Sequence, residues 1–133
     1  MSASAAQPHR RLWLLLGWGM VFSVIVLSLV PLNVDLQEGR DKIAHSLAYA
    51  GMVFWFSLLF GGRARQLAIA AAFAMMGVGI EFLQGLTDYR TFEVADMVAN
   101  AVGAALGWGL AQTPLRNGLA WAEAWLDRLT RGS

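Results

Sequence analysis

An apolar run without a single charge, covering residues 12–30, limits the possible folds of this chain more than any other feature. An α-helix rises about 1.5 Å per residue, so about 20 apolar residues cross the roughly 30 Å hydrocarbon core of a bilayer. The run therefore predicts a membrane-spanning helix. Composition agrees, because 57% of the 133 residues are hydrophobic and only 14% are charged, against roughly 25% in an average soluble domain.

Three more apolar runs follow, each with polar residues near one end. They cover residues 43–60 with His45, residues 67–83 with Glu81, and residues 94–111 with Asp96 and Asn100. Four spans use most of the chain and leave no length for a soluble domain. We therefore predict an all-α fold, an integral membrane four-helix bundle over residues 12–111, preceded by a tail at residues 1–11.

The carboxyl-terminal segment, residues 114–130, has a different pattern. Its apolar residues recur at helical spacing on one face, namely Leu115, Leu119, Ala122, Leu126 and Leu129. Charged residues, including Glu123 and Asp127, fall elsewhere on the helix and argue against a fifth span. The pattern predicts an amphipathic interfacial helix on the cytoplasmic membrane surface.

Charges divide unequally between the two sides of a four-span bundle. The amino tail, the middle loop and the carboxyl tail hold seven of the ten basic residues and two of the nine acids, a net charge of +5, against −4 on the other side. Cytoplasmic loops are enriched in Lys and Arg, so both termini are predicted to lie in the cytoplasm, with the protein in the cell (inner) membrane. We interpret residues 12–30 as a retained span, because they exceed a usual signal-peptide core and no Ala-x-Ala site follows them.

Polar residues gather at the outer ends of spans two to four. Three of them, Asp41, His45 and Tyr49, are one helical turn apart and share a face. The complete set is Asp41, Lys42, His45, Tyr49, Glu81, Gln84, Arg90, Asp96 and Asn100. A charge at membrane depth is costly, so such residues are normally paired and often functional. The three helices are therefore expected to turn these side chains toward a common outer site.

The same residues form three motifs on successive spans. The motifs are Asp-Lys-x-x-His-x-x-x-Tyr at residues 41–49, Glu-x-x-Gln at residues 81–84, and a third pattern with Arg90, Asp96, Asn100, Gly103 and Gly107. In this order, the pattern over residues 41–107 resembles the VanZ-like family of small bacterial membrane proteins. The resemblance implies a setting in the cell envelope and a link to glycopeptide antibiotics such as teicoplanin, and it implies no particular reaction.

A binding site is the function that these residues favour most. Lys42 and Arg90 would present two positive charges at the outer headgroup level, where arginine can hold two phosphate oxygens at once. Tyr49 and Gln84 could orient the rest of the ligand. We therefore expect the protein to bind an anionic amphiphile: a lipid-linked cell-wall precursor, a phospholipid headgroup or a lipoglycopeptide.

Two other interpretations use the same cluster. In a membrane enzyme acting on a lipid phosphate, His45 would be the general base, oriented by a neighbouring aspartate. The catalytic residues would then be His45, Glu81 and Asp96. In a purely structural network, the acids would pair with Lys42 or Arg90 and fix the register of the helices.

Other kinds of site and partner are less favoured by the sequence. A single histidine in the cluster argues against zinc, so no metal site and no cofactor are expected. The chain has no cysteine, which excludes disulfides and thiolate ligands. Expected partners are membrane lipids or a lipid-linked envelope precursor, and no nucleic acid. Small residues at Gly103 and Gly107 could support a homodimer, and packing within one chain would explain them equally well.

Overall fold

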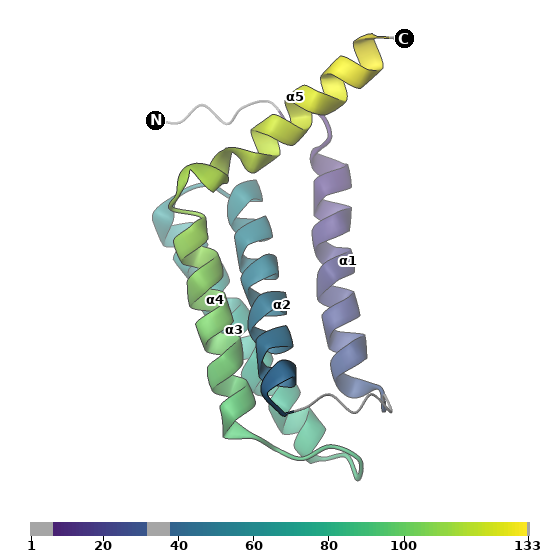
Figure 1. The fold of residues 1–133 in the computed structure, drawn as a ribbon, viewed down its shortest axis with the longest axis vertical. Helices are drawn as coiled ribbons and strands as arrows, with labels where there is room; N and C mark the ends of the chain where they lie inside the picture. The colour runs from purple at the N-terminus through teal and green to yellow at the C-terminus, as the bar shows by residue number, and fades with distance from the viewer. Residues whose placement is uncertain (1–6, 32–37, 133) are drawn as a thin grey trace.

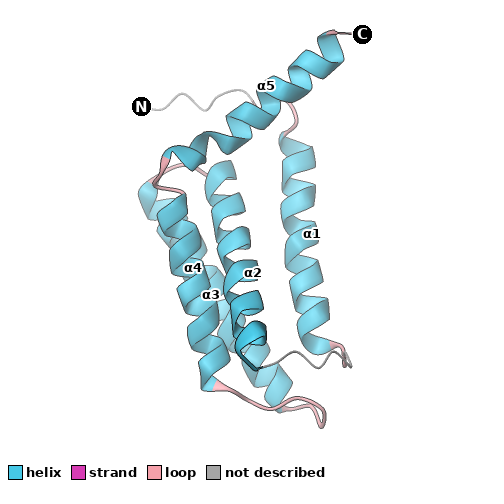
Figure 2. Ribbon diagram, in the orientation of Figure 1, coloured by secondary structure: helices cyan, strands magenta, loops and turns pink. Residues whose placement is uncertain are grey.

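The computed structural model describes residues 7–31 and 38–132, and within these residues every regular element is a helix (Figure 2). The elements are α1 (Arg10–Leu29), α2 (Glu38–Leu59), α3 (Arg63–Gly85), α4 (Val94–Leu110), the short 3-10 helix η1 (Pro114–Asn117) and α5 (Gly118–Arg131). The all-α prediction is confirmed. Residues 32–37, in the loop predicted between the first two spans, lie outside the described residues.

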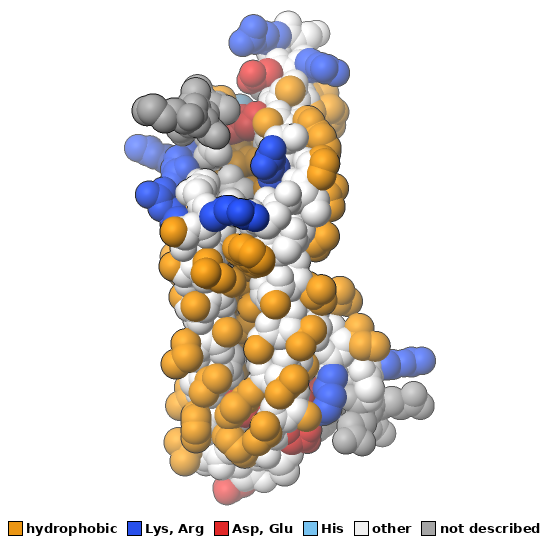
Figure 3. Space-filling model, turned by 90° about the vertical axis from the view of Figure 1, so that its left-hand side faces the viewer, with side chains coloured by type: hydrophobic (Ala, Val, Ile, Leu, Met, Phe, Trp, Pro, Cys, Tyr) orange, Lys and Arg blue, Asp and Glu red, His pale blue; other side chains and the backbone are white. Residues whose placement is uncertain are grey.

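Several helices are suited to a membrane. The helices α1, α2 and α3 are each long and apolar enough to cross one, and α4 with the η1–α5 segment is a further candidate that is bent by 74°. In Figure 1, α1 to α4 run side by side and α5 crosses one end of the bundle. Large apolar side chains such as Leu15, Phe22 and Leu47 are exposed. On the face shown in Figure 3, hydrophobic side chains cover the middle of the molecule, which suits contact with lipid.

Polar residues extend two helices beyond their apolar runs. The helix α2 begins at Glu38, before Asp41, and α3 begins at Arg63 rather than at Leu67. Glu, Arg and Gln are good helix formers, so the apolar spacing alone underestimates helix length. Between these helices the chain turns at Gly62, whose φ of 99° lies in the region that favours glycine.

The most extensive helix contact joins α2 and α4, and two glycines make it possible. A Cβ atom added to Gly103 would overlap the carbonyl oxygen of Ser46, and one added to Gly107 would overlap that of Ala50. The two backbones therefore touch directly, as small residues in membrane helices allow. This packing accounts for both glycines within a single chain, without a second copy.

Aromatic side chains attach α1 to α2. The rings of Trp13 and Trp55 meet edge to face with centroids 5.9 Å apart, and Trp55 Nε1 donates a hydrogen bond of 2.9 Å to the Trp13 carbonyl. Gly17 leaves room for Trp55 and Phe56, because an added Cβ would lie 2.9 Å from Trp55 Cδ1. Here α1 is attached mainly through side chains, in contrast to the backbone contact between α2 and α4.

A buried carboxylate, Glu123, attaches α5 to the start of α1. Glu123 Oε1 accepts hydrogen bonds from Trp13 Nε1 at 2.6 Å and from the backbone N–H of His9 at 3.3 Å. Glu123 Oε2 lies 2.6 Å from His9 Nδ1, and Leu119 packs nearby against Trp13 and Leu59. Glu123 is 8% exposed. This corrects the expectation that Glu123 lies away from the packed face of the amphipathic helix.

The surroundings of Glu123 also change its acidity. Burial raises the pKa of the carboxyl, but the hydrogen bonds from His9 and Trp13 lower it by more, so the net pKa is below its ordinary value. Glu123 is therefore ionised at neutral pH. Its negative charge strengthens the bonds that hold α5 across the end of the bundle.

Candidate functional site

The predicted polar residues meet at the end of the bundle that is remote from α5 (Figure 1). The chain direction alternates from helix to helix, so this end collects the beginning of α2, the end of α3 and the beginning of α4. Residues from all three motifs thus reach the same level of the bundle. The spacing of these residues along each helix determines which of their side chains face a neighbouring helix.

Lys42 is held between two carboxylates. Its Nζ donates hydrogen bonds to Glu93 Oε2 at 3.0 Å and to Asp96 Oδ1 at 3.2 Å. Asp96 is in the first turn of α4, where the positive end of the helix dipole also favours a negative charge. The charge of Lys42 is therefore already balanced, and this amine is less available to an external anion.

A second group consists of Asp41, His45 and Asp96. His45 Nε2 lies 3.5 Å from Asp41 Oδ1 within α2. One possible ligand atom from each of the three residues lies within 4.8 Å of the other two. The Asp41 side chain is the most open, with 36% exposure against 15% for His45 and 11% for Asp96. Asp41 and His45 have the arrangement of a general base with an orienting carboxylate, and all three residues together could hold a cation.

Glu81 has a different role in the structure. It is 1% exposed, and its Oε1 accepts a 2.6 Å hydrogen bond from the backbone N–H of Glu93. This bond ties the end of α3 to the segment that precedes α4. Glu81 therefore fixes the position of Glu93, which in turn contacts Lys42.

Gln84 and Arg90 contact α1 rather than this cluster. Gln84 Nε2 donates to the Ser28 carbonyl at 2.7 Å, and an Arg90 guanidinium nitrogen donates to the Leu27 carbonyl at 3.4 Å. Both bonds satisfy carbonyl groups near the end of α1, where the helix leaves such acceptors without partners. The expectation that Lys42 and Arg90 jointly present their charges to a ligand is not supported by this geometry.

Tyr49 and Asn100 lie deeper in the bundle, beside a glycine of α3. They are 1% and 2% exposed. A Cβ added to Gly77 would lie 2.9 Å from Asn100 Nδ2 and 3.2 Å from Tyr49 Cε1. Asn100 Oδ1 is buried without a hydrogen-bond partner in the described part of the chain. These two residues lie below the ionisable groups, deeper in the bundle.

Glu93 is a residue of the candidate site that was not predicted from the sequence. The available signal was its position three residues before Asp96, which places both acids at the start of the same helix. Ser46, the hydroxyl nearest His45 in sequence, donates a 2.9 Å hydrogen bond to the Ala99 carbonyl. This hydroxyl joins α2 to α4, which argues against a role as a nucleophile.

Negative charge exceeds positive charge in the cluster. The carboxyl groups belong to Asp41, Glu81, Glu93 and Asp96. Among the described residues, Lys42 is the only lysine or arginine that forms an ion pair with any of them. The site should therefore attract a positive group more readily than a free anion.

Several apolar helices, packed side by side with a polar cluster at one end, are the features of a helical membrane protein. A family model described as VanZ/LLP1 matches residues 7–116, and the chain belongs to this family. The resemblance found in the sequence motifs is thereby confirmed.

A relative in fission yeast shares part of the sequence. The chain is 35% identical over 80 residues to an uncharacterized protein of Schizosaccharomyces pombe. The match covers 58% of this chain and 45% of the relative, so this chain spans less than half of the relative's length. No solved structure matches the chain.

Proposed function

We propose that Asp41, His45 and Asp96 bind a positively charged group on the polar head of a membrane-anchored amphiphile. The observation that carries this proposal is the approach of their ligand atoms to within 4.8 Å of one another in a cluster with excess negative charge. The charge of the proposed ligand group is opposite to the negative charge expected from the sequence. The reason is that Lys42 is balanced by two acids and Arg90 bonds to α1. A zwitterionic head group with an amine suits the site, as does an amine-bearing lipoglycopeptide. Retention of such an antibiotic would give tolerance to glycopeptides such as teicoplanin.

A divalent metal ion is the second candidate ligand for the same three residues. Two carboxylates and one imidazole are suitable ligands for several divalent ions, and three protein ligands leave coordination positions open. Such an ion would reverse the local charge. An anionic head group, as expected from the sequence, would then bind through the ion.

The binding proposal is tested with the purified protein in a nonionic detergent. We expect dioctanoyl phosphatidylethanolamine to bind saturably after treatment with EDTA. Asp41→Asn should weaken this binding by roughly tenfold or more, because it removes a charge-assisted hydrogen bond. Microscale thermophoresis provides the affinities, and addition of MgCl₂ or ZnCl₂ distinguishes the metal candidate.

The matched control is Asp88→Asn, the same charge change at an exposed residue between α3 and α4. It should leave the affinity unchanged. Equal weakening of phosphatidylethanolamine binding by the two variants, or no weakening by Asp41→Asn, would count against the amine site.

We also propose that the protein crosses the inner membrane four times, with both termini and α5 on the cytoplasmic side. The unequal charges of the two ends support this orientation. The chain has no cysteine, so single-cysteine variants give an unambiguous signal. In intact bacteria, Asp88→Cys should react with a membrane-impermeant maleimide, whereas Ala64→Cys should react only after lysis. The opposite labelling pattern would reverse the orientation.

A further inference from the structure

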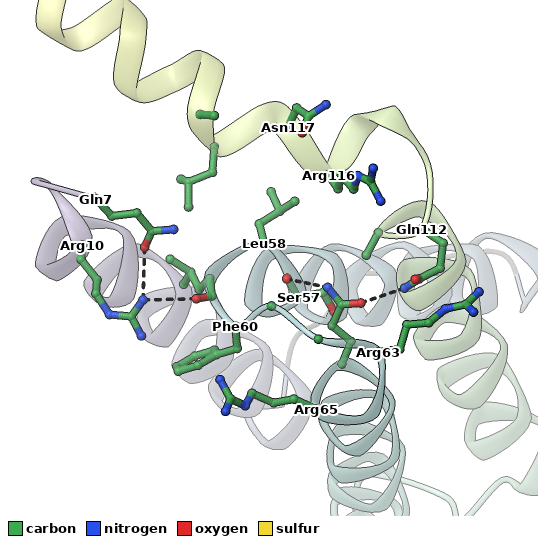
Figure 4. A pocket seen from close by; sticks show the side chains of 17 residues that line it. Gln7, Arg10, Ser57, Leu58, Phe60, Arg63, Arg65, Gln112, Arg116 and Asn117 are labelled. Carbon is green, nitrogen blue, oxygen red and sulfur yellow. Dashed lines mark hydrogen bonds between the residues drawn. The ribbon is translucent and has the colours of Figure 1, made fainter. Parts of the chain in front are cut away.

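A cavity of about 1030 Å³ lies at the opposite end of the bundle from the acidic cluster, below the η1–α5 segment (Figure 4). It is lined by the start of α1, the end of α2, the start of α3 and η1. Its volume is in the range of sites that hold a small molecule or a whole head group. The cavity has no residue in common with the polar cluster described above.

Four arginines line the cavity, and no acidic residue is among the described residues that line it. They are Arg10, Arg63, Arg65 and Arg116. Arg10 is partly engaged, because its guanidinium donates to Gln7 Oε1 at 3.1 Å and to the Leu59 carbonyl at 3.2 Å. The other three guanidinium groups form no hydrogen bond or ion pair within residues 7–31 and 38–132. These arginines give the cavity a net positive charge, which attracts anions.

Neutral polar groups complete the lining. Gln66 Nε2 donates to the Ser57 carbonyl at 3.0 Å, and Gln66 Oε1 accepts from Gln112 Nε2 at 2.9 Å. This chain of bonds fixes both amides at the wall of the cavity. The start of α3 is also there, and its N-cap residue, Gly62, provides no side-chain cap, so the positive end of the helix dipole faces the same region.

We propose that this cavity binds a phosphate-bearing anionic group, either the head group of a membrane lipid or a soluble phosphate compound. Arg63, Arg65 and Arg116 contact the phosphate oxygens. Guanidinium groups suit this task because each can hold two phosphate oxygens. Exposed Trp121 and Trp125 of α5 favour the membrane interface, which places the cavity at headgroup level.

The test uses the full-length protein in a nonionic detergent with three probes: dioctanoyl phosphatidylglycerol, pyrophosphate and dioctanoyl phosphatidylcholine. We expect saturable binding of an anionic probe, at least about tenfold tighter than that of the phosphatidylcholine. Binding of phosphatidylglycerol alone assigns the site to a lipid head group. Comparable binding of pyrophosphate assigns it to a soluble phosphate compound.

Variants link this binding to the cavity. The double variant Arg63→Gln and Arg65→Gln should lower the affinity by at least about tenfold. The matched control, Arg128→Gln with Arg131→Gln, removes the same charge from the exposed end of α5 and should have no effect. If the α3 double variant does not fold, Arg116→Gln should still weaken binding by about fivefold. Absence of saturable binding of both anionic probes, or equal weakening by the control, would overturn the proposal.

Discussion

Gly103→Ala is expected to destabilise the protein severely, by about 3 kcal/mol or more. The added Cβ would overlap the carbonyl oxygen of Ser46, which belongs to the α2 backbone and cannot rotate away as a flexible side chain would. The two helices would have to separate along their main contact. That movement would also lengthen the hydrogen bond from the Ser46 hydroxyl to the Ala99 carbonyl. A lower yield of monodisperse protein and a lower melting temperature in detergent would measure the effect.

Gly109→Ala is the matched control for Gly103→Ala. Gly109 is in the same helix, and an added Cβ would meet no atom within 4 Å. Alanine is favoured over glycine in a helix by roughly 0.5–1 kcal/mol, so this variant should be as stable as the original protein or slightly more so. Similar melting temperatures for the two variants would show that α2 and α4 are not in backbone contact at Gly103.

Glu123→Ala is expected to release α5 from α1. The change removes the acceptor for Trp13 Nε1 and for the backbone N–H of His9, and it leaves the indole donor buried. Hydrogen exchange in α5 should become faster by at least about tenfold, whereas exchange in α2 and α4 should be unchanged. Asp127→Asn, on the same helix but outside this contact, provides the control. Unchanged exchange in α5 of Glu123→Ala would contradict the contact.

The same contact makes the attachment of α5 to α1 dependent on pH. The pKa of Glu123 is lowered in the folded protein, so the ionised carboxylate stabilises the attachment of α5. This contribution is fully present above the unfolded-state pKa of about 4.3 and is lost as the pH falls through the lower folded-state value. Exchange in α5 should therefore be protected between about pH 7 and pH 5, and protection should decrease below about pH 4. Glu123→Gln should abolish the pH dependence.

The sequence predicted the all-helical fold well, for a physical reason. Apolar runs of about 20 residues determine where spans lie, and alternating direction brings Asp41, Glu81 and Asp96 to one end of the bundle. The side-chain pairs were harder to predict. Helical periodicity indicates the helix face on which a residue lies and its position along the bundle axis. It does not indicate whether Arg90 reaches an acid or the Leu27 carbonyl of α1.

Glu123 was mispredicted for a related reason. Its neighbours in α5 suggested a polar, exposed position, whereas its partner Trp13 is 110 residues earlier in the sequence. A local sequence pattern cannot indicate a contact between residues so far apart in the sequence. The arginine-lined cavity was not predicted either, because in the sequence its arginines indicate only which side of the membrane they face.

The glycine seam between α2 and α4 also limits how the molecule can change shape. Two backbones in direct contact cannot slide past each other without steric overlap, so this pair behaves as a rigid unit. The helix α1 is held instead by aromatic rings and by single side-chain bonds such as that from Gln84 to the Ser28 carbonyl. Rings and amides can change rotamer and re-form their contacts. A rearrangement of the described helices is therefore expected first at α1.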